Sequence, residues 1–430
     1  MLDIKLIRDN PDLVKAGLAK KQTDTSLVDR VLQVDAERKI LRQETEAKQA
    51  EQNQASTRMA AASPEERENL RGELKALSDT IKASNERLAN LDAQWLVLMR
   101  QIPNLPAPEV PDGTSDKENQ VVKTIGEKPH FDFQPKDHET LCLELDLLDT
   151  ERAAKVSGAK FYYLKNELVI LEMAVLRFAM DVLKAKGFTP MSVPVLVREE
   201  AMYNAAHFAA PEDASDGDAY QLERDGLYLA GTAEVGLVNY HAGEILREAD
   251  LPLRYAGISA CYRREAGTYG KETRGLYRVH SFNKVEMVSF VRPQDAGQEH
   301  ELLLSLHEDL LQKLGLPYQV VLNCGGDLGT PQYKKWDVET WMAGMGKYGE
   351  TCSASNDTDY QSRRQNTRYR ASADEKDIRY PYTLNATAFA SPRILIPILE
   401  NNQRADGSIA IPEVLIPYTG FSEIRKKDSI

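Results

Sequence analysis

The sequence predicts an α+β protein in which a long antiparallel helical hairpin precedes a largely antiparallel sheet flanked by helices. Two observations support this fold class. Residues 27–101 contain one proline, Pro64, and one glycine, Gly72, and their apolar residues recur at helical spacing. From residue 115 onward, strand-like and helical segments are irregularly interspersed, which is typical of an antiparallel sheet and not of repeated βαβ units.

The hairpin is predicted from a break between two helical patterns. Ser63 can cap a helix, Pro64 suits a first helical position, and Glu66 can complete a capping box. The apolar residues that follow recur at alternating steps of four and three, with one polar member, at Leu70, Leu74, Leu77, Ile81, Ser84, Leu88, Leu91, Trp95 and Leu98. Two legs of roughly 35 residues, each about 50 Å long, would therefore fold back on each other.

The hairpin pattern is compatible with two roles. A heptad seam is commonly a dimerisation coiled coil, whereas a projecting arm would reach a long partner. The outer half, AKQAEQNQASTRMAAAS, is polar and has few apolar anchors, which favours an arm. A proline-rich segment at 103–113 ends it. We therefore expect an N-terminal domain at 1–110, with the hairpin at about 27–101, and a second domain at 111–430.

The second domain should begin with a helix and then add strands. Residues 163–186 form an amphipathic pattern that Gly187 should end, because glycine readily adopts the left-handed backbone of a helix terminus. An extended segment follows at 188–197. Further strands are expected where short apolar runs lie between turn residues, at 251–263, 277–290, 316–323, 334–342 and 407–415.

Composition limits the function and the location. The net charge of −12 argues against a general phosphate-binding surface, but residues 1–110 hold nearly equal numbers of acids and bases, so binding of nucleic acid would be local. Four cysteines without a CxxC pair indicate reduced thiols. No apolar signal segment and no uncharged run near the roughly 18 residues of a membrane span occur, so we expect a cytoplasmic protein.

If the protein binds ATP, another device must hold the nucleotide, because no GxxxxGK[ST] loop and no GxGxxG after a strand occur. The segment 261–287 instead places five basic residues on or beside a glycine-rich loop: Arg263, Arg264, Lys271, Arg274 and Arg278. Guanidinium groups on strands can hold phosphate in bidentate fashion. Glu265 and Glu286 among them could bind an amine or a hydroxyl, or neutralise the arginines. A solvated charged hairpin would have the same composition.

Two later segments carry further candidates. Glu350 precedes a run of small hydroxyl residues, and magnesium accepts such a site through one carboxylate and water; a plain surface carboxylate is the alternative. Asn385 and Thr387 offer hydrogen-bonding groups. Arg393 opens an apolar helix, where a cation is unfavourable for the helix dipole, so an anion should face it.

These segments together resemble the seryl-tRNA synthetases, a family of the class II aminoacyl-tRNA synthetases. Segments 261–287 and 384–403 look like motifs 2 and 3 of that class, and the helix at 163–186 with its extended continuation looks like motif 1. Stretches similar to the seryl enzymes themselves are ERAAKVSGAKFYYLK, LAGTAEV, REAGTYGKETRGLYRVHSFNKVE and ADGSIAIPEVLIPY. The resemblance covers essentially residues 1–422.

The resemblance implies a six- to seven-stranded antiparallel class II sheet with flanking helices and a homodimer built on motif 1. It implies that serine and ATP form seryl-adenylate with Mg²⁺, and that the seryl group passes to the 3′ end of serine tRNA. The N-terminal domain would be the tRNA-binding domain, whose hairpin grips the long variable arm of the tRNA, and 111–430 the catalytic domain. Whether selenocysteine tRNA is a second substrate stays open.

Matching motif positions assign the nucleotide site. Arg263 resembles the catalytic arginine on the α-phosphate, Arg393 resembles the catalytic arginine on the γ-phosphate, and Phe282 resembles the ring that stacks on adenine. Arg274 would lie in the motif 2 loop near the phosphates and the tRNA end. The other ATP-binding positions, of which the last two also resemble the Mg²⁺ ligands, are Glu265, Arg278, Glu350 and Ser353.

The same matching assigns the serine site. Glu286 resembles the carboxylate that holds the serine substrate, and Thr232 and Glu234 resemble the groups that receive its amino group. The full set of serine-binding positions is Thr232, Glu234, Arg263, Glu286, Asn385 and Thr387.

Three positions depart from the family pattern: Gly231 before the TAE segment, Arg264 beside the motif 2 arginine, and Ala386. Two rival functions are weaker. A ligase that loads an amino acid onto a carrier protein would lack the helical arm. An inactive paralogue would lack one of the charged motif residues, and all of these are present.

Overall fold

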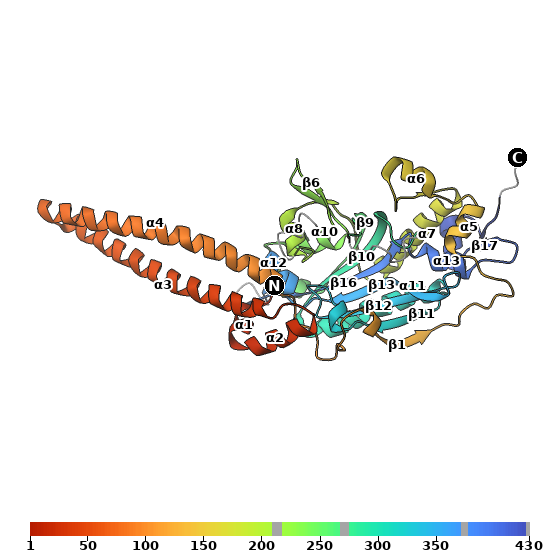
Figure 1. Ribbon diagram of the computed structural model, residues 1–430, viewed down its shortest axis with the longest axis horizontal. Coiled ribbons are helices and arrows are strands. Elements are labelled where there is room, and N and C mark those ends of the chain that lie inside the picture. The colour runs from red at the N-terminus through yellow and green to blue at the C-terminus, as the bar shows by residue number, and fades with distance from the viewer. Residues whose placement is uncertain (209–216, 267–274, 371–376, 427–430) are drawn as a thin grey trace. The chain divides into compact units, whose positions relative to one another are not determined.

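In the computed structural model, which describes residues 1–208, 217–266, 275–370 and 377–426, the chain forms two compact units (Figure 1). One unit contains Leu2–Ala19 and Thr23–Ile102. The other contains Met1, Lys20–Gln22 and the chain from Pro103 onward. The first is entirely helical and the second holds the sheet.

The helical unit is dominated by two long helices, α3 (Ser26–Ala61) and α4 (Pro64–Gln101), and begins with α1 (Ile4–Asp9) and α2 (Pro11–Lys20). Figure 1 shows α3 and α4 lying side by side along their length. The expected capping box starts α4, because Ser63 and Glu66 each bind the other's backbone N–H. The predicted antiparallel hairpin is confirmed.

Ion pairs join the two legs of the hairpin. Near the base, Arg38 lies over the ring of Trp95 at 4.2 Å and donates to Asp92 at 2.6 Å. Near the tip, Arg58 pairs with Glu73 at 3.3 Å. Within α3, the buried apolar residues concentrate in the half nearer its start. The polar outer half therefore has little apolar surface with which to form an interface of its own.

The second unit is built on an eight-stranded sheet of order β1-β11-β12-β13-β16-β10-β9-β4. Its strands pair antiparallel except β4, which runs parallel to β9. The bounds in sheet order are Gln120–Ile125, Tyr318–Leu322, Lys334–Met342, Lys347–Asn356, Tyr382–Ser391, Ser281–Val291, Leu253–Tyr262 and Thr189–Ser192.

The antiparallel α+β fold class is confirmed, and the sheet has eight strands where six or seven were expected. The extra strands are at the edges. Strand β1 is almost wholly exposed and so lacks the alternation of a half-buried strand, and β4 contains Pro190, which is tolerated at sheet edges. The expected strand at 407–415 is wrong for most of its length. Only β17 (Ile409–Ala410) forms, because Pro412 ends the pairing and a 3₁₀ turn follows.

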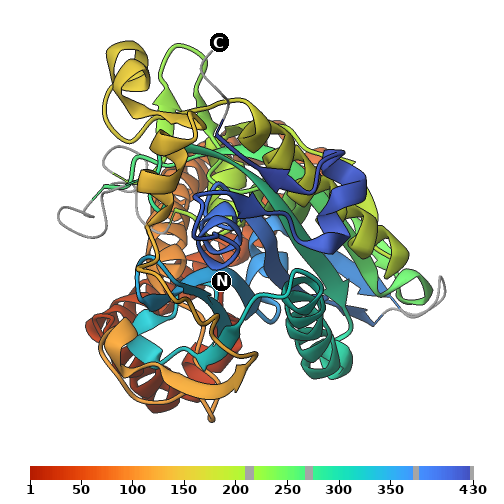
Figure 2. The same ribbon diagram turned by 90° about the vertical axis from the view of Figure 1, so that its right-hand side faces the viewer.

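Helices cover the sheet and bury a large apolar core (Figure 2). Helix α7 (Glu167–Ala185) packs against β10 and β16, and α11 (Ala296–Lys313) packs against β13 and β16. The expected helix at 163–186 begins four residues late because Tyr163–Leu164 form β3. Gly187 follows its last turn with φ of +89°. Arg393 lies just before α13 (Leu395–Asn401).

Short elements complete the second unit. Its other helices are α5 (His138–Glu144), α6 (Thr150–Ser157), α8 (Glu199–Asn204), α10 (Glu234–Val238), α12 (Tyr360–Gln365) and α14 (Ile416–Thr419). Its other strands are β2 (Leu148–Asp149), β5 (Leu196–Arg198), β6 (Tyr220–Leu222), β7 (Leu227–Leu229), β8 (Ile245–Arg247), β14 (Arg368–Arg370), β15 (Ile378–Arg379) and β18 (Glu423–Ile424). Across the described ranges, no helix has the length and apolar character needed to cross a membrane.

A buried carboxylate fixes the chain that leads into the central sheet. Glu400 is fully buried and accepts hydrogen bonds from the N–H and the ring Nδ1 of His138, both at 2.9 Å, and from the N–H groups of Gly344 and Met345 at 2.9 and 3.2 Å. The other ring nitrogen of His138 accepts from the N–H of Leu276 at 3.1 Å. Glu400 therefore positions, through His138, the segment that continues into Tyr277 and Arg278.

We predict that Glu400→Ala lowers the free energy of unfolding by about 3 kcal/mol or more, because it leaves several buried donors without an acceptor. Urea-induced unfolding measures this loss. Glu151→Ala, at a carboxylate that is 84% exposed and pairs with Lys155, is the control and should cost less than about 1 kcal/mol. Equal effects of the two substitutions would show that Glu400 is not an anchor.

Candidate active site

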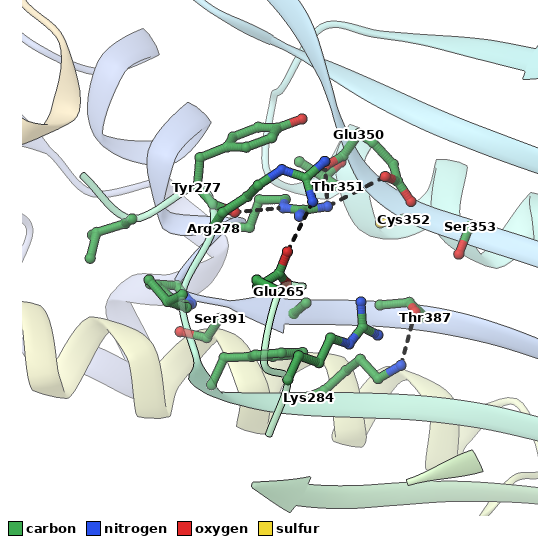
Figure 3. A pocket seen from close by; sticks show the side chains of 17 residues that line it. Glu265, Tyr277, Arg278, Lys284, Glu350, Thr351, Cys352, Ser353, Thr387 and Ser391 are labelled. Atoms are coloured by element: carbon green, nitrogen blue, oxygen red, sulfur yellow. Dashed lines mark hydrogen bonds and ion pairs between the residues drawn. The ribbon is translucent and has the colours of Figure 1, made fainter. Parts of the chain in front are cut away.

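A cavity lies over the middle strands of the sheet (Figure 3). Strands β10, β13 and β16 supply its floor, and the segments before β10 and after β16 supply its walls. Its lining residues are Arg263, Glu265, Leu276, Tyr277, Arg278, Val279, Phe282, Lys284, Glu350, Thr351, Cys352, Ser353, Thr387, Ala390, Ser391, Pro392 and Arg393. Every residue expected from the sequence to bind ATP is among them. Three stretches far apart in the sequence thus meet at one place.

Arg393 is held at the wall of the cavity by contacts with Tyr277 and Glu350. Its Nε donates to the carbonyl oxygen of Tyr277 at 3.2 Å, and its guanidinium group lies over the Tyr277 ring at 4.6 Å. Its Nη1 reaches the carboxylate of Glu350 at 3.4 Å. The sequence did not single out Tyr277. The sequence signal that could have indicated Tyr277 is an aromatic residue two positions after a glycine, Gly275. In the structure the backbone turns at this glycine, with φ of +63°.

Two further arginines face the cavity. Arg278 donates to Glu265 at 3.1 Å, and Glu265 has a left-handed backbone with φ of +51°. Arg263 donates from Nε to the carbonyl oxygen of Gly231 at 3.3 Å and lies 5.3 Å from the centre of the Phe282 ring. Lys271 and Arg274 lie outside the described residues.

The carboxylate of Glu350 is ionised. Burial raises its pKa, but the positive charges of Lys335, Arg393, Arg263 and Arg278 together bring the pKa below its usual value. Its side chain is 42% exposed and therefore accessible from the cavity. Lys335 comes from the neighbouring strand β12 and was not expected from the sequence.

A second carboxylate, that of Asp337, belongs to the same cluster of charges. It is buried beside Lys335, whose Nζ lies 2.9 Å from its carboxylate. Burial raises the pKa of Asp337 to about 7, although Lys335 lowers it. Asp337 lies opposite Ser353 in the register of β12 and β13. Of the two carboxylates, only Glu350 lines the cavity.

The expected serine-binding residues form a polar cluster that adjoins the cavity. On one side, Glu286 accepts from the hydroxyl of Thr387 at 3.1 Å and forms a buried ion pair with Lys284. Burial raises the pKa of Glu286, and Lys284 lowers it. Lys284 was missed, because a lysine in the middle of an apolar strand gives no sign of which carboxylate it meets.

On the other side of the cluster, Glu234 accepts from Asn385 at 3.2 Å and from Gln361 at 2.8 Å. The hydroxyl of Thr232 accepts from the N–H of Glu234, the first residue of α10, at 3.1 Å. Burial raises the pKa of Glu234, but a hydrogen bond and charge from His207 bring it below its usual value. Gln361 was not expected from the sequence.

The residues that depart from the family pattern also lie near these groups. A side chain at Gly231 would come within 3.3 Å of the Arg263 side chain. Arg264 turns away and donates to the carbonyl oxygen of Gly217 at 3.3 Å. Ala386 is fully buried, where β16 pairs with β10 and β13.

An antiparallel sheet that carries arginines and a carboxylate around one cavity is the architecture of the class II aminoacyl-tRNA synthetase core. Residues 220–402 match the tRNA synthetase class II core domain (G, H, P, S and T), and residues 1–106 match the seryl-tRNA synthetase N-terminal domain.

Relatives that match this chain along its whole length identify the family within that class. The chain is 43% identical to the serine–tRNA ligase of Dictyoglomus turgidum and 44% identical to that of Dictyoglomus thermophilum, over 99% of this chain and all of each relative. It matches the structure of seryl-tRNA synthetase from Pyrococcus horikoshii complexed with ATP, with a TM-score of 0.92, 40% identity and full coverage of both chains. The match to the cytoplasmic serine–tRNA ligase of Naegleria fowleri in complex with AMP has a TM-score of 0.86 and 27% identity, over 100% of this chain and 99% of that one. The chain belongs to the seryl-tRNA synthetase family, and its reaction is the ATP-dependent attachment of serine to tRNA.

We predict that Lys284→Met makes stability depend on pH. Without Lys284 the pKa of buried Glu286 rises further above its ordinary value of 4.5, so the folded state binds a proton that the unfolded state releases. The stability deficit relative to the unsubstituted protein should therefore grow as the pH rises from about 5 to 8, by about 1.4 kcal/mol for each unit of added pKa shift. Urea-induced unfolding at several pH values measures this deficit. In Lys284→Met/Glu286→Gln the extra pH dependence should vanish, and a deficit independent of pH in the single variant would contradict the prediction.

Proposed function

We propose that the cavity forms seryl-adenylate and then transfers the seryl group to the 3′-terminal adenosine of serine tRNA. The observation that supports this is the convergence of Arg263, Arg393 and the ionised Glu350 on one cavity. A carboxylate of serine attacks the α-phosphorus of ATP, the bond to the bridging oxygen breaks, and pyrophosphate leaves. A hydroxyl of the tRNA end then attacks the seryl carbonyl and loses its proton, the bond from the carbonyl carbon to the phosphate oxygen breaks, and AMP leaves.

The first step needs no general base, because the serine carboxylate is already a nucleophile. The barrier lies in the negative charge that accumulates as pyrophosphate departs, which fixed positive charges stabilise. In our assignment Arg263 binds the α-phosphate and Arg393 the γ-phosphate, while Phe282 lies against adenine. Arg278 and Glu265, which are joined by a hydrogen bond, form the neighbouring wall and both contact the nucleotide.

Magnesium fits the residues present. Glu350 is an ionised and accessible carboxylate, and Ser353 on the same strand adds a hydroxyl oxygen. In the described part of the chain, no cluster of three or more potential ligands forms a closed metal cage. This agrees with the preference of Mg²⁺ for one or two carboxylates together with substrate phosphates. When bound there, Mg²⁺ would neutralise phosphate charge.

We assign serine selection to the polar cluster. Glu234 and Thr232 receive the amino group, Glu286 and Thr387 receive the hydroxyl side of the substrate, and Asn385 completes the pocket. A buried pocket whose polar groups stay unpaired with alanine should reject it by up to roughly 10⁴-fold. With alanine, Glu286 and Thr387 keep their contacts to each other but lose the serine hydroxyl as a further hydrogen-bond partner, and this loss supplies the discrimination.

We propose that residues 1–110 are the tRNA-binding domain, with the hairpin as an arm that grips the tRNA by shape and backbone, and that 111–430 is the catalytic domain. The polar outer half of α3 supports an arm over a dimerisation coiled coil. The match of residues 1–106 to the seryl-tRNA synthetase N-terminal domain supports the same assignment.

We further infer a homodimer in the cytoplasm. Apolar side chains of α7 and β9 are exposed, with fractions of 42% for Ile170, 64% for Met173 and 37% for Ile258, as expected if a second copy covers them. All four cysteines are free thiols, which suits a reducing compartment.

We predict that Arg263→Ala reduces serine-dependent ATP–pyrophosphate exchange by about 10³-fold, the usual cost of removing one preorganised group from a developing negative charge. Exchange assays with radiolabelled pyrophosphate measure the loss. Arg247→Ala, at an arginine that is 80% exposed and pairs with Asp250, is the control and should keep normal exchange. Near-normal exchange in Arg263→Ala would refute the role of Arg263.

Replacing residues 30–98 with a short flexible linker should spare ATP–pyrophosphate exchange but reduce aminoacylation of serine tRNA by at least about 100-fold, since only the second step needs the tRNA positioned. Arg30 and Leu98 line the same groove between α3 and α4, so the cut ends can be joined. Equal loss of both activities would mean that the hairpin is needed for the fold of the catalytic domain and not for the tRNA.

A further inference from the structure

One oxygen of the Glu234 carboxylate is held by two neutral side chains. Its Oε1 accepts from Nε2 of Gln361 at 2.8 Å and from Nδ2 of Asn385 at 3.2 Å. Its Oε2 lies 3.7 Å from Nε2 of His207, a longer contact. Glu234 is the first residue of α10, a helix of only 5 residues, which by itself gives little rigid support. The two amide donors therefore determine where this carboxylate points.

Gln361, on α12, is fixed in one orientation by its own contacts. It is fully buried, and its Nε2 donates a second hydrogen bond to the carbonyl oxygen of Ala205 at 3.1 Å. Its Oε1 accepts from the hydroxyl of Thr383 at 2.8 Å. A carbonyl oxygen and an ionised carboxylate can only accept hydrogen bonds, so an amide turned over would place its oxygen against both of them. Gln361 must therefore present an N–H group to Glu234.

Strand β16 supports both donors of Glu234. Thr383 and Asn385 are two residues apart on this strand, so their side chains lie on the same face of the sheet. Asn385 reaches Glu234 directly, and Thr383 reaches it through Gln361. Thr383 is fully buried, and β16 is paired with β10 and, in part, with β13. A carboxylate on a short helix is thereby positioned by a central strand of the sheet.

The donors of Glu234 differ in charge from the partner of Glu286. Glu286 forms a buried ion pair with Lys284, which compensates its charge. The two amide donors are neutral, so they stabilise the ionised form of Glu234 without adding a positive charge. Burial raises the pKa of Glu234, and the interactions that lower it include those with His207 and Gln361. An ammonium group should therefore be drawn to Glu234, and a hydroxyl group to Glu286.

We propose that Gln361 is a positioning residue for the amino group of serine, with Thr383 behind it. By occupying Oε1 of Glu234, Gln361 directs Oε2 to the substrate ammonium group and leaves the negative charge of the carboxylate uncompensated. The inference rests on the proposed function of Glu234 as receiver of the amino group. Because Gln361 acts through Glu234, its loss should weaken serine binding and not the chemical step.

Kinetics of Gln361→Met in the full-length protein test this role. Methionine has a similar length but no N–H group, so Glu234 would keep Asn385 as a donor and lose its shorter hydrogen bond. The KM for serine in ATP–pyrophosphate exchange should rise about tenfold, which is the lower end of the cost of a lost hydrogen bond to a charged group. The KM for ATP and the kcat should stay within about twofold.

An analogue without the amino group separates positioning of that group from general damage to the pocket. The compound β-hydroxypropanoate keeps the carboxylate and the hydroxyl group of serine, so its competitive inhibition should change less than about twofold in Gln361→Met. Inhibition that weakens as much as serine binding would overturn the inference, because Gln361 would then support the whole pocket. An unchanged KM for serine would overturn it as well.

The matched control is Gln365→Met, the same substitution on the same helix. Gln365 is also buried, with an exposed fraction of 4%, but its side-chain amide has no hydrogen-bond partner among the described residues. This control should leave the KM for serine unchanged. A rise as large as that in Gln361→Met would mean that any change on α12 disturbs serine binding, and the inference would fail.

Thr383→Val tests the support behind Gln361. Without the hydroxyl donor Gln361 is held less firmly, and the KM for serine should rise about threefold. The double variant Gln361→Met/Thr383→Val should show no larger rise than Gln361→Met alone, because Thr383 acts through Gln361. Thermal melting verifies folding, and if Gln361→Met does not fold, the nearly isosteric Thr383→Val decides alone. An unchanged KM for serine in Thr383→Val, or single effects that multiply, would contradict the inference.

Glu234→Gln separates this inference from the proposed function. If Glu234→Gln raises the KM for serine but Gln361→Met does not, only the positioning role of Gln361 is wrong. If Glu234→Gln also leaves the KM for serine unchanged, the assigned role of Glu234 fails and the role of Gln361 fails with it.

Discussion

The site depends on holding several guanidinium groups close together before any phosphate is bound. Like charges in one cavity repel strongly where water is partly excluded. Glu265 offsets Arg278, and Glu350 offsets Arg393, each through a direct contact. Arg263 instead meets a carbonyl oxygen and an aromatic face. The cavity therefore keeps an excess of positive charge, which attracts a triphosphate without making the empty site unstable.

The sheet sets these contacts by its register, and two irregularities adjust it. The pairing of β10 with β16 shifts between Val285 and Glu286, and the pairing of β12 with β13 shifts where Glu350 lies opposite Glu339. A β-bulge re-aims the side chains next to it and increases the local twist. Both functional carboxylates lie beside such a bulge. The irregularities are thus part of how the proposed serine and nucleotide sites are formed.

The sequence indicates which chemical groups form the site, but not all of the contacts between these groups. Arg263, Glu350 and Arg393 could be found because their motifs place unusual charges on apolar elements. Lys335 could not, because it comes near Glu350 only through the pairing of β12 with β13, which no local pattern encodes. The edge strand β1 was missed for a related reason, since a strand with little buried surface has no alternation to detect.

Strand β10 carries residues of both proposed binding sites, the one for ATP and the one for serine. Side chains two residues apart on a strand point to the same face, so Phe282, Lys284 and Glu286 form one row, about 7 Å from each member to the next. The first two line the nucleotide cavity, and Lys284 pairs with the third at the serine pocket. In our proposed assignment of Phe282 to adenine and Glu286 to serine, the separation between the two ligands is set by the rise of a central strand with hydrogen-bonded neighbours on both sides. Because in-line attack tolerates errors of less than about 1 Å, a strand is better suited than a loop to bring the serine carboxylate to the α-phosphate.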